Sequence, residues 1–278
     1  MTSDGREVIG NFEMVEGKFR TRREVLAMGV VAAGTALAAI SPGKATDSPP
    51  DASPTAPPVT TAASTLVKPP QAFTAKDFSS LLNRKLEGLS AEAIEKHLKL
   101  YNAYVAKSNE IQGLLSAVDL SKPAANATYC PLRELLVEQS FALNGVIYHE
   151  LYFGNLGGSG GEPGGELKTA VEASFGSVGK FMDVFKAAAK SMRGWVIVGS
   201  STRDGQLHVF GLDAHNMHVP AGVIPVAVLD VYEHAYMIDY GIDRGSYLEA
   251  FLKNMDWDAC NKRLASARKY PVGPESTV

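Results

Sequence analysis

Three histidines and one aspartate are the residues of this chain that could together hold a metal ion. They are His97, His149, Asp230 and His234, and the last two lie four positions apart. Three imidazoles and one carboxylate make a nitrogen and oxygen ligand set, which suits redox iron or manganese rather than metals held by thiolates. Because the residues are spread along the sequence, such a site requires separate elements to converge in a folded domain.

Two of these histidines lie in segments with helical periodicity. Ser90, a residue type that often caps helices, precedes apolar residues at helical spacing, which predicts a helix that carries His97. A loop around Pro123 leads to a second predicted helix, residues 132–153, which carries His149. We expect these helices to form an antiparallel hairpin in an N-terminal domain over residues 74–156.

The second half of the chain begins with a glycine-rich hinge, residues 157–165. After two helical segments, the spacing of apolar residues changes from that of a helix to that of a strand. The predicted helices are 166–173, 178–191, 247–253 and 256–266, and the predicted strands are 194–198, 206–210 and 223–229, with Asp230 closing the third strand. We therefore expect an α+β fold: an N-terminal antiparallel helical hairpin followed by a C-terminal α/β domain, residues 157–272, whose three-stranded antiparallel sheet is flanked by helices.

The N-terminal segment has the pattern of an export signal. Arg22 and Arg23 precede Val25 and Leu26, and a weakly apolar stretch follows that is too short to be a confident membrane span. We expect residues 1–45 to be a twin-arginine signal peptide and residues 46–73, rich in Pro, Ala, Ser and Thr, to be a linker. Export would place the protein in the periplasm, the cell envelope or outside the cell, with no membrane span in the mature chain. A chance arginine pair and an uncleaved membrane anchor are the alternatives.

Composition and charge exclude some functions. Apolar residues make up 45% of the chain, so it can bury a core without disulfides, and the net charge of −3 with no basic run argues against a nucleic-acid partner. The two cysteines, Cys130 and Cys260, could pair in an exported protein or remain buried thiols.

The residues around the candidate ligands resemble motifs of the iron/manganese superoxide dismutase family, over residues 89–264. The motifs are Tyr148-His149-Glu150-Leu151-Tyr152-Phe153 in the second helix, Gly161-Glu162-Pro163 in the hinge, Phe175-Gly176-Ser177 with Phe181, Gly194-Trp195 in the first strand, Asp230-Val231-Tyr232-Glu233-His234-Ala235-Tyr236, and Asp256-Trp257. Each motif is weak by itself, and together they make the resemblance specific.

The resemblance implies roles for the four residues. His97, His149 and His234 would be neutral imidazole ligands and Asp230 a monodentate carboxylate ligand of one Fe or Mn ion per subunit, with solvent in a fifth position. The implied reaction is the dismutation of superoxide to dioxygen and hydrogen peroxide in two one-electron steps, with the metal cycling between two oxidation states. The family also implies a homodimer, or a tetramer built from it.

Further roles follow from the same resemblance. Glu233 would reach His234 of the partner subunit and fix its tautomer. Trp195 would wall the site, and His215 would stand where the family usually places a Gln that hydrogen-bonds the bound solvent. Gly145 fits members that leave the helix-side position empty. The alternative interpretations are a solvated turn residue for Glu233, a core aromatic for Trp195 and a surface-loop histidine for His215.

The first helix departs from the family pattern. The family usually has a gateway His four residues after the first ligand and a Tyr eight after it, whereas Tyr101 and Tyr104 follow His97 by four and seven residues. Spacings of four and seven lie on one face of a regular helix, so we infer that one residue, a helix bulge, has been lost. Tyr104 would then remain the gateway phenol and Tyr101 would replace the gateway His. In the family, the gateway His contacts a Tyr of the partner subunit that lies three residues after the last ligand. That position is Met237 in this sequence.

These departures leave alternatives to a superoxide dismutase. An altered gateway could permit a peroxidase-like activity at the same metal, or the chain could be an exported metal-binding protein that has lost turnover. Zinc would fit the number of ligands but has no redox cycle. Catalytic turnover per bound metal separates these possibilities.

Overall fold

The computed structural model describes residues 7–9, 12–15, 18–21, 71–118, 128–270 and 273. The chain divides into two compact units, Met1–Thr61 and Ala62–Val278. The arginine pair and the linker as far as residue 70 lie outside the described residues, so the predicted signal, linker and export stay predictions. The two domains predicted from the sequence, residues 74–156 and 157–272, both fall within the second unit.

The first unit contains a short meander that the sequence patterns did not predict. Its strands are β1 (Glu7–Ile9), β2 (Phe12–Val15) and β3 (Lys18–Thr21), paired antiparallel in the order β1-β2-β3. The meander ends before the arginine pair.

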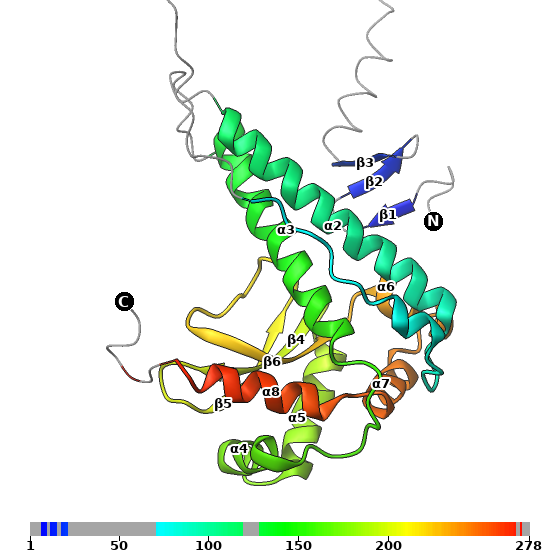
Figure 1. Cartoon of the computed structure of the whole chain (residues 1–278), viewed down its shortest axis with the longest axis vertical. Helices are drawn as coiled ribbons and strands as arrows, with labels where there is room; N and C mark the ends of the chain where they lie inside the picture. The colour runs from blue at the N-terminus through cyan, green and yellow to red at the C-terminus, as the bar shows by residue number, and fades with distance from the viewer. Residues whose placement is uncertain are drawn as a thin grey trace, which may run out of the picture. The chain divides into compact units, whose positions relative to one another are not determined.

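The second unit contains the predicted helical hairpin. The helices α2 (Ala91–Ala117) and α3 (Pro131–Phe153) lie side by side (Figure 1). The Ser90 hydroxyl accepts a hydrogen bond from the Ala93 backbone N–H at 3.0 Å, so the predicted cap is present. At α3 the cap is Cys130, whose sulfur accepts from the Arg133 N–H at 3.3 Å, and Pro131 occupies the first turn.

An extended arm precedes the hairpin and runs along α2 (Figure 1). Phe73 and Asn109 exchange two hydrogen bonds, one from the Phe73 N–H at 2.7 Å and one to the Phe73 carbonyl at 2.9 Å. The arm ends in the 3₁₀ helix η1 (Ser79–Asn83), which also packs on α2. The Tyr101 hydroxyl accepts from the Lys76 backbone N–H at 2.8 Å, which fixes the middle of the arm.

The rest of the unit is a small sheet with helices around it. The helices α4 (Gly165–Phe175) and α5 (Val178–Ser191) lead to β4 (Trp195–Ser201), β5 (Leu207–Leu212) and β6 (Val223–Asp230), and α6 (Glu233–Tyr240), α7 (Arg244–Lys253) and α8 (Trp257–Ala267) follow. The strand order is β5-β4-β6 with both pairings antiparallel. The predicted α+β class and three-stranded antiparallel sheet are thus confirmed, whereas α6 was not predicted.

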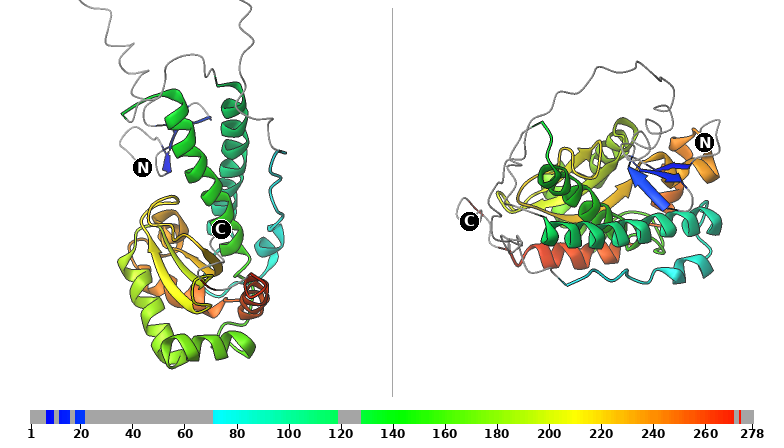
Figure 2. Two further views of the ribbon diagram at one scale, coloured as in Figure 1. Left: turned by 90° about the vertical axis from the view of Figure 1, so that its left-hand side faces the viewer. Right: turned by 90° about the horizontal axis from the view of Figure 1, so that it is seen from above.

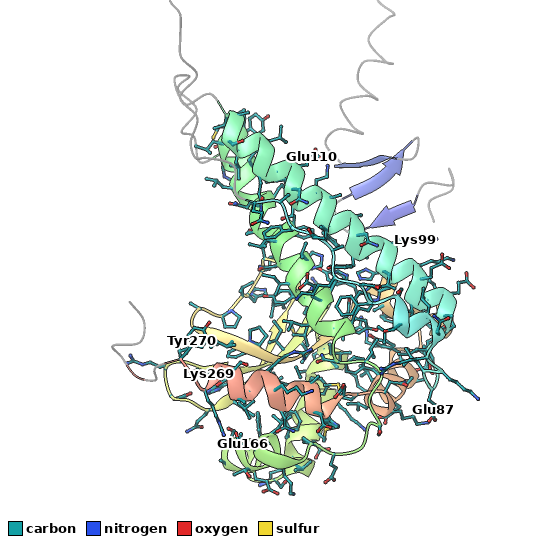
Figure 3. The ribbon with its side chains drawn as sticks, viewed as in Figure 1. Glu87, Lys99, Glu110, Glu166, Lys269 and Tyr270 are labelled. Atoms are coloured by element: carbon teal, nitrogen blue, oxygen red, sulfur yellow. The ribbon has the colours of Figure 1, made fainter. Side chains whose placement is uncertain are left out.

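The central strand explains how the sheet reaches the metal ligands. Every residue of β4 is buried, and its first residue, Trp195, pairs with Asp230 at the end of β6. The helices α3 and α8 contact β6, while α4 and α5 contact β5; Figure 2 shows the sheet between these groups. Charged side chains on the outer helix faces, such as Lys99, Glu110 and Glu166, point away from this core (Figure 3).

Two further expectations concern the described residues. Cys130 and Cys260 are both buried free thiols, so they do not pair with each other in this structure. No helix in the described part of the chain is long and apolar enough to cross a membrane.

Candidate metal centre

The four candidate ligands converge in the second unit. One ligand atom from each of His97, His149, Asp230 and His234 lies within 4.8 Å of the other three. The Asp230 Oδ2 atom is 3.2 Å from His97 Nε2, 3.7 Å from His149 Nε2 and 3.0 Å from His234 Nε2. Ligand atoms at about 2.1 Å from a common metal are up to about 4 Å apart, so these atoms are gathered on the scale of one coordination sphere.

Each ligand comes from a different element. The hairpin contributes His97 from α2 and His149 from α3, β6 ends in Asp230, and the first turn of α6 carries His234. The first three side chains are buried, and His234 is partly exposed. The hairpin and the sheet must therefore both be formed before the four side chains can meet.

The Asp230 carboxylate is held by its surroundings. Its Oδ1 atom accepts a hydrogen bond from the Tyr232 backbone N–H at 2.9 Å, which leaves Oδ2 to face the three imidazoles. Burial acts to raise the pKa of Asp230, but His234 and His97 outweigh it and hold that pKa below its usual value. The carboxyl group is therefore ionised, as a metal ligand must be.

The His149 ring carries the feature that best fits a bound cation. Its Nδ1 atom is 2.5 Å from the Gly145 carbonyl oxygen, which can only accept, so Nδ1 carries the proton and Nε2 carries a lone pair. This Nε2 is buried and has no hydrogen-bond partner among the described residues. An unpaired buried polar atom costs about 1–3 kcal/mol. Burial, with a smaller contribution from His97, lowers the pKa of His149 well below its usual value, so the lone pair is not neutralised by a proton.

Trp195, His215 and Tyr104 form a connected row beside the ligands. The Trp195 indole Nε1–H donates to His215 Nδ1 at 2.8 Å, and His215 Nε2 is 2.8 Å from the Tyr104 hydroxyl oxygen. The Tyr104 ring centroid lies 5.3 Å from that of His149, and the Trp195 centroid 5.1 Å from it. All four residues are buried, so the alternative of a surface-loop position for His215 is wrong.

Buried groups in this row remain uncharged. Burial lowers the pKa of His215 to about 3 and raises the pKa of Tyr104 well above its usual value. At neutral pH the phenol is therefore protonated and the imidazole is neutral. The Asn144 amide fixes the loop that carries His215 by donating to its carbonyl oxygen at 2.8 Å.

Tyr101 is not part of the row formed by Trp195, His215 and Tyr104. Its ring is fully buried and its hydroxyl donates to Glu150 Oε1 at 3.0 Å while accepting from the Lys76 backbone N–H. Glu150 also forms an ion pair with the Lys76 ammonium group. The helix α2 is continuous from 91 to 117, and the inferred loss of a residue relative to the family pattern stays a prediction. Tyr101 thus fastens the arm to the hairpin, while its predicted gateway role remains a prediction.

Glu233 and Met237 lie on the exposed side of the centre. Within the part of the chain that the structure describes, the Glu233 carboxylate makes no hydrogen bond or ion pair, and it is exposed. Met237 and its neighbour Ile238 on α6 are also exposed, at 45% and 41%.

Sequence reasoning missed two aromatic contributions to the centre. The ring of Tyr232 stacks on His234 with centroids 5.1 Å apart and also faces His215 at 5.1 Å. Tyr247 donates to the Asp230 carbonyl oxygen at 2.8 Å from α7. Tyr232 could have been found because it lies between two ligands in one motif, whereas nothing in the sequence near Tyr247 connects it with Asp230.

Comparison with known proteins agrees with this arrangement. Residues 163–263 match the family model of iron/manganese superoxide dismutases, C-terminal domain. The superoxide dismutase [Fe] of Aquifex aeolicus is 46% identical over 189 residues, which are 67% of this chain and 89% of that protein. The superoxide dismutase [Fe] of Cupriavidus metallidurans is 39% identical, over 66% of this chain and 92% of that protein. The superoxide dismutase [Mn/Fe] of Aeropyrum pernix is 33% identical, over 66% and 86%.

The fold and the metal centre place this chain in a class of redox metalloenzymes. The chain belongs to the iron/manganese superoxide dismutase family. The expected family, enzyme class and use of iron or manganese are thereby confirmed.

Proposed function

We propose that this chain dismutes superoxide with one Fe or Mn ion per subunit, bound by His97, His149, Asp230 and His234. The observation that carries the assignment is the buried, unpartnered Nε2 atom of His149 facing an ionised carboxylate and two further imidazoles. Buried polar atoms are nearly always paired, and a bound ion is one way in which such a lone pair is satisfied. A bound cation would satisfy it and would neutralise the buried charge of Asp230.

The overall reaction converts two superoxide anions and two protons into dioxygen and hydrogen peroxide. The bound metal supplies the one-electron oxidation and reduction. The protein residues must admit a small anion, exclude other reductants and provide protons. Tyr104 is the proposed proton-bearing group, because its phenol is kept protonated by burial and is hydrogen-bonded to His215 beside the ligand histidines.

The residues around the ligands have separate proposed tasks. The carbonyl of Gly145 sets the tautomer of His149. The Oδ2 atom of Asp230 would bind the ion beside the Nε2 atoms of His97 and His234. Trp195 closes the side of the centre next to β4, since its ring packs edge-on to His149. This enclosure keeps bulk water from reaching the ligands at that side.

We further propose that the active form is a homodimer in which Glu233 binds His234 of the partner subunit. Support comes from the exposed carboxylate, the partly exposed His234 and the apolar surface at Met237 and Ile238. Light scattering on a size-exclusion column tests the dimer, and Glu233→Gln tests the contact. A monomer with full activity would contradict this proposal.

We also propose export by the twin-arginine route, to the periplasm, the envelope or the exterior. Support comes from the sequence around Arg22 and Arg23 and from the low-complexity segment that follows. Replacing both arginines by lysine should leave the protein in the cytoplasm, which cell fractionation can measure. Unchanged localisation of the double variant would refute this route.

The function is tested on residues 46–278 loaded separately with iron and with manganese. Elemental analysis gives metal per chain, and a superoxide assay gives turnover per bound metal. We expect close to one ion per chain and dismutation with one or both metals. Full metal occupancy without dismutation would contradict the proposal, because binding would then be separated from turnover.

A further inference from the structure

The imidazole of His215 has both of its nitrogens engaged by neighbouring side chains. Nδ1 accepts from the indole N–H of Trp195, and Nε2 contacts the hydroxyl of Tyr104, each at 2.8 Å. An indole nitrogen can only donate. Nδ1 must therefore carry a lone pair, which excludes both the Nδ1–H tautomer and the doubly protonated imidazolium.

The position of the remaining proton follows. A neutral imidazole whose Nδ1 accepts has its single N–H at Nε2, so His215 donates to the Tyr104 oxygen. The hydroxyl hydrogen of Tyr104 then points away from His215. In residues 71–118 and 128–270 no other hydrogen-bond partner of this hydroxyl is found. That hydrogen is consequently not used by the protein.

Ring packing keeps His215 from turning over. Its ring centroid lies 4.5 Å from Phe141, 4.8 Å from Tyr104 and 5.1 Å from Tyr232. Phe141 belongs to α3 and Tyr232 to the segment between the ligands Asp230 and His234, so elements of the centre surround the ring. A 180° flip would place a C–H against the indole N–H and lose that hydrogen bond.

We propose that Trp195 is a positioning residue that fixes His215 as the Nε2–H tautomer, so that the hydroxyl hydrogen of Tyr104, not an imidazole N–H, is the donor available to substrate. This inference rests on the proposed function and refines it. An amide at position 215 would have two hydrogens, one for Tyr104 and one for the metal centre. The imidazole has a single hydrogen, already given to Tyr104, so the predicted direct contact between His215 and bound solvent is replaced by one through Tyr104.

The tautomer can be measured without any turnover. The full chain, labelled with ¹⁵N and loaded with diamagnetic Zn²⁺, contains six histidines, and the His215 signals are those lost in His215→Gln. We expect an unprotonated Nδ1, a protonated Nε2 and a through-hydrogen-bond coupling between Trp195 Nε1 and His215 Nδ1. A protonated Nδ1, or the absence of this coupling, would overturn the proposal.

Variants separate the role of the indole from that of the phenol. Trp195→Phe should shift both His215 nitrogen signals towards the average of a tautomer mixture, whereas Tyr104→Phe should leave the Nε2–H form intact. Trp257→Phe is the matched control, because that indole donates to the Gly161 carbonyl instead. If Trp195→Phe does not fold, two measurements still test the proposal. They are the coupling between Trp195 Nε1 and His215 Nδ1 in the wild type and the tautomer of His215 in Tyr104→Phe. Loss of the Nε2–H form in Tyr104→Phe would refute control by Trp195, while failure of dismutation alone would refute only the proposed function.

Discussion

Gly145 is the position where adding a single methyl group should disturb the centre. It lies in α3, one turn before His149, and packs against the buried ring of Tyr104. A Cβ atom at Gly145 would lie 2.8 Å from Tyr104 Cδ1 and 3.0 Å from Cγ. Favourable carbon–carbon contacts are about 3.5–4.0 Å, so the ring would have to move in Gly145→Ala. Movement of the ring would weaken the 2.8 Å contact between Tyr104 and His215.

The expected effect on stability is a balance of opposing contributions. Replacing Gly by Ala inside a helix favours folding by about 1 kcal/mol. Overpacking a buried site costs about 1–3 kcal/mol, and a weakened hydrogen bond costs about 1 kcal/mol. We therefore expect Gly145→Ala to lower the free energy of unfolding by about 1–3 kcal/mol, with a lower melting temperature and reduced turnover per bound metal.

Gly113→Ala is the control, because Gly113 lies in α2 with no atom within 4 Å of an added Cβ. It should gain up to about 1 kcal/mol. Urea unfolding followed by circular dichroism, at equal metal loading, measures both variants, since bound metal itself adds stability. If Gly145→Ala is as stable as Gly113→Ala and turns over normally, the packing of Tyr104 on α3 is not as described.

Three further predictions concern the ligands and the two tyrosines. His149→Ala should fall from one bound metal to almost none by elemental analysis, while His208→Ala, a surface control, should keep its metal; normal metal content in the first variant would reject the ligand assignment. Tyr104→Phe should keep metal but lower proton-dependent turnover by about 10²-fold. Tyr101→Phe should retain turnover and loosen the arm, which would be measured as faster proteolysis before residue 79. The reverse pattern would show that Tyr101 is the gateway residue. Burial lowers the pKa values of His97 and His149, so below pH about 6.5 the unfolded chain binds more protons than the folded one. The metal-free protein should lose stability as pH falls from about 6.5, and urea unfolding that is independent of pH between 7 and 5 would contradict this.

Local signals predicted much of the fold. The Ser90 cap, the two hairpin helices and the three strands follow from residue types and periodicity over short windows, and the structure confirms these elements. Some predicted ends differ by a few residues: α7 begins at Arg244 and not at the predicted 247, and β4 extends from the predicted 198 to Ser201. Helix α6 (Glu233–Tyr240) was missed because only Ala235 and Tyr236 are buried in it, so it has no apolar stripe at helical spacing.

The candidate site was predicted in a different way. Spacing alone could not bring His97 to Asp230, which is 133 residues away, and that convergence came from the family resemblance. The contacts of Tyr101 could not be predicted, because its partners are a backbone N–H in the arm and Glu150 in α3. Helical spacing places Tyr101 on the same face as His97 but does not determine which neighbour its hydroxyl reaches.

The arm also determines how the domain would bear a mechanical load. A pull on the chain before residue 71 would first reach the paired hydrogen bonds between Phe73 and Asn109. The contacts of Lys76 with Tyr101 and Glu150 come next along the chain, and only after them does tension reach η1. The arm would separate from α2 in that order. The first hydrogen bonds to break are those to Asn109, which lies twelve residues after His97 in α2. They would break under load before the contacts nearer to the ligand-bearing part of the hairpin are strained.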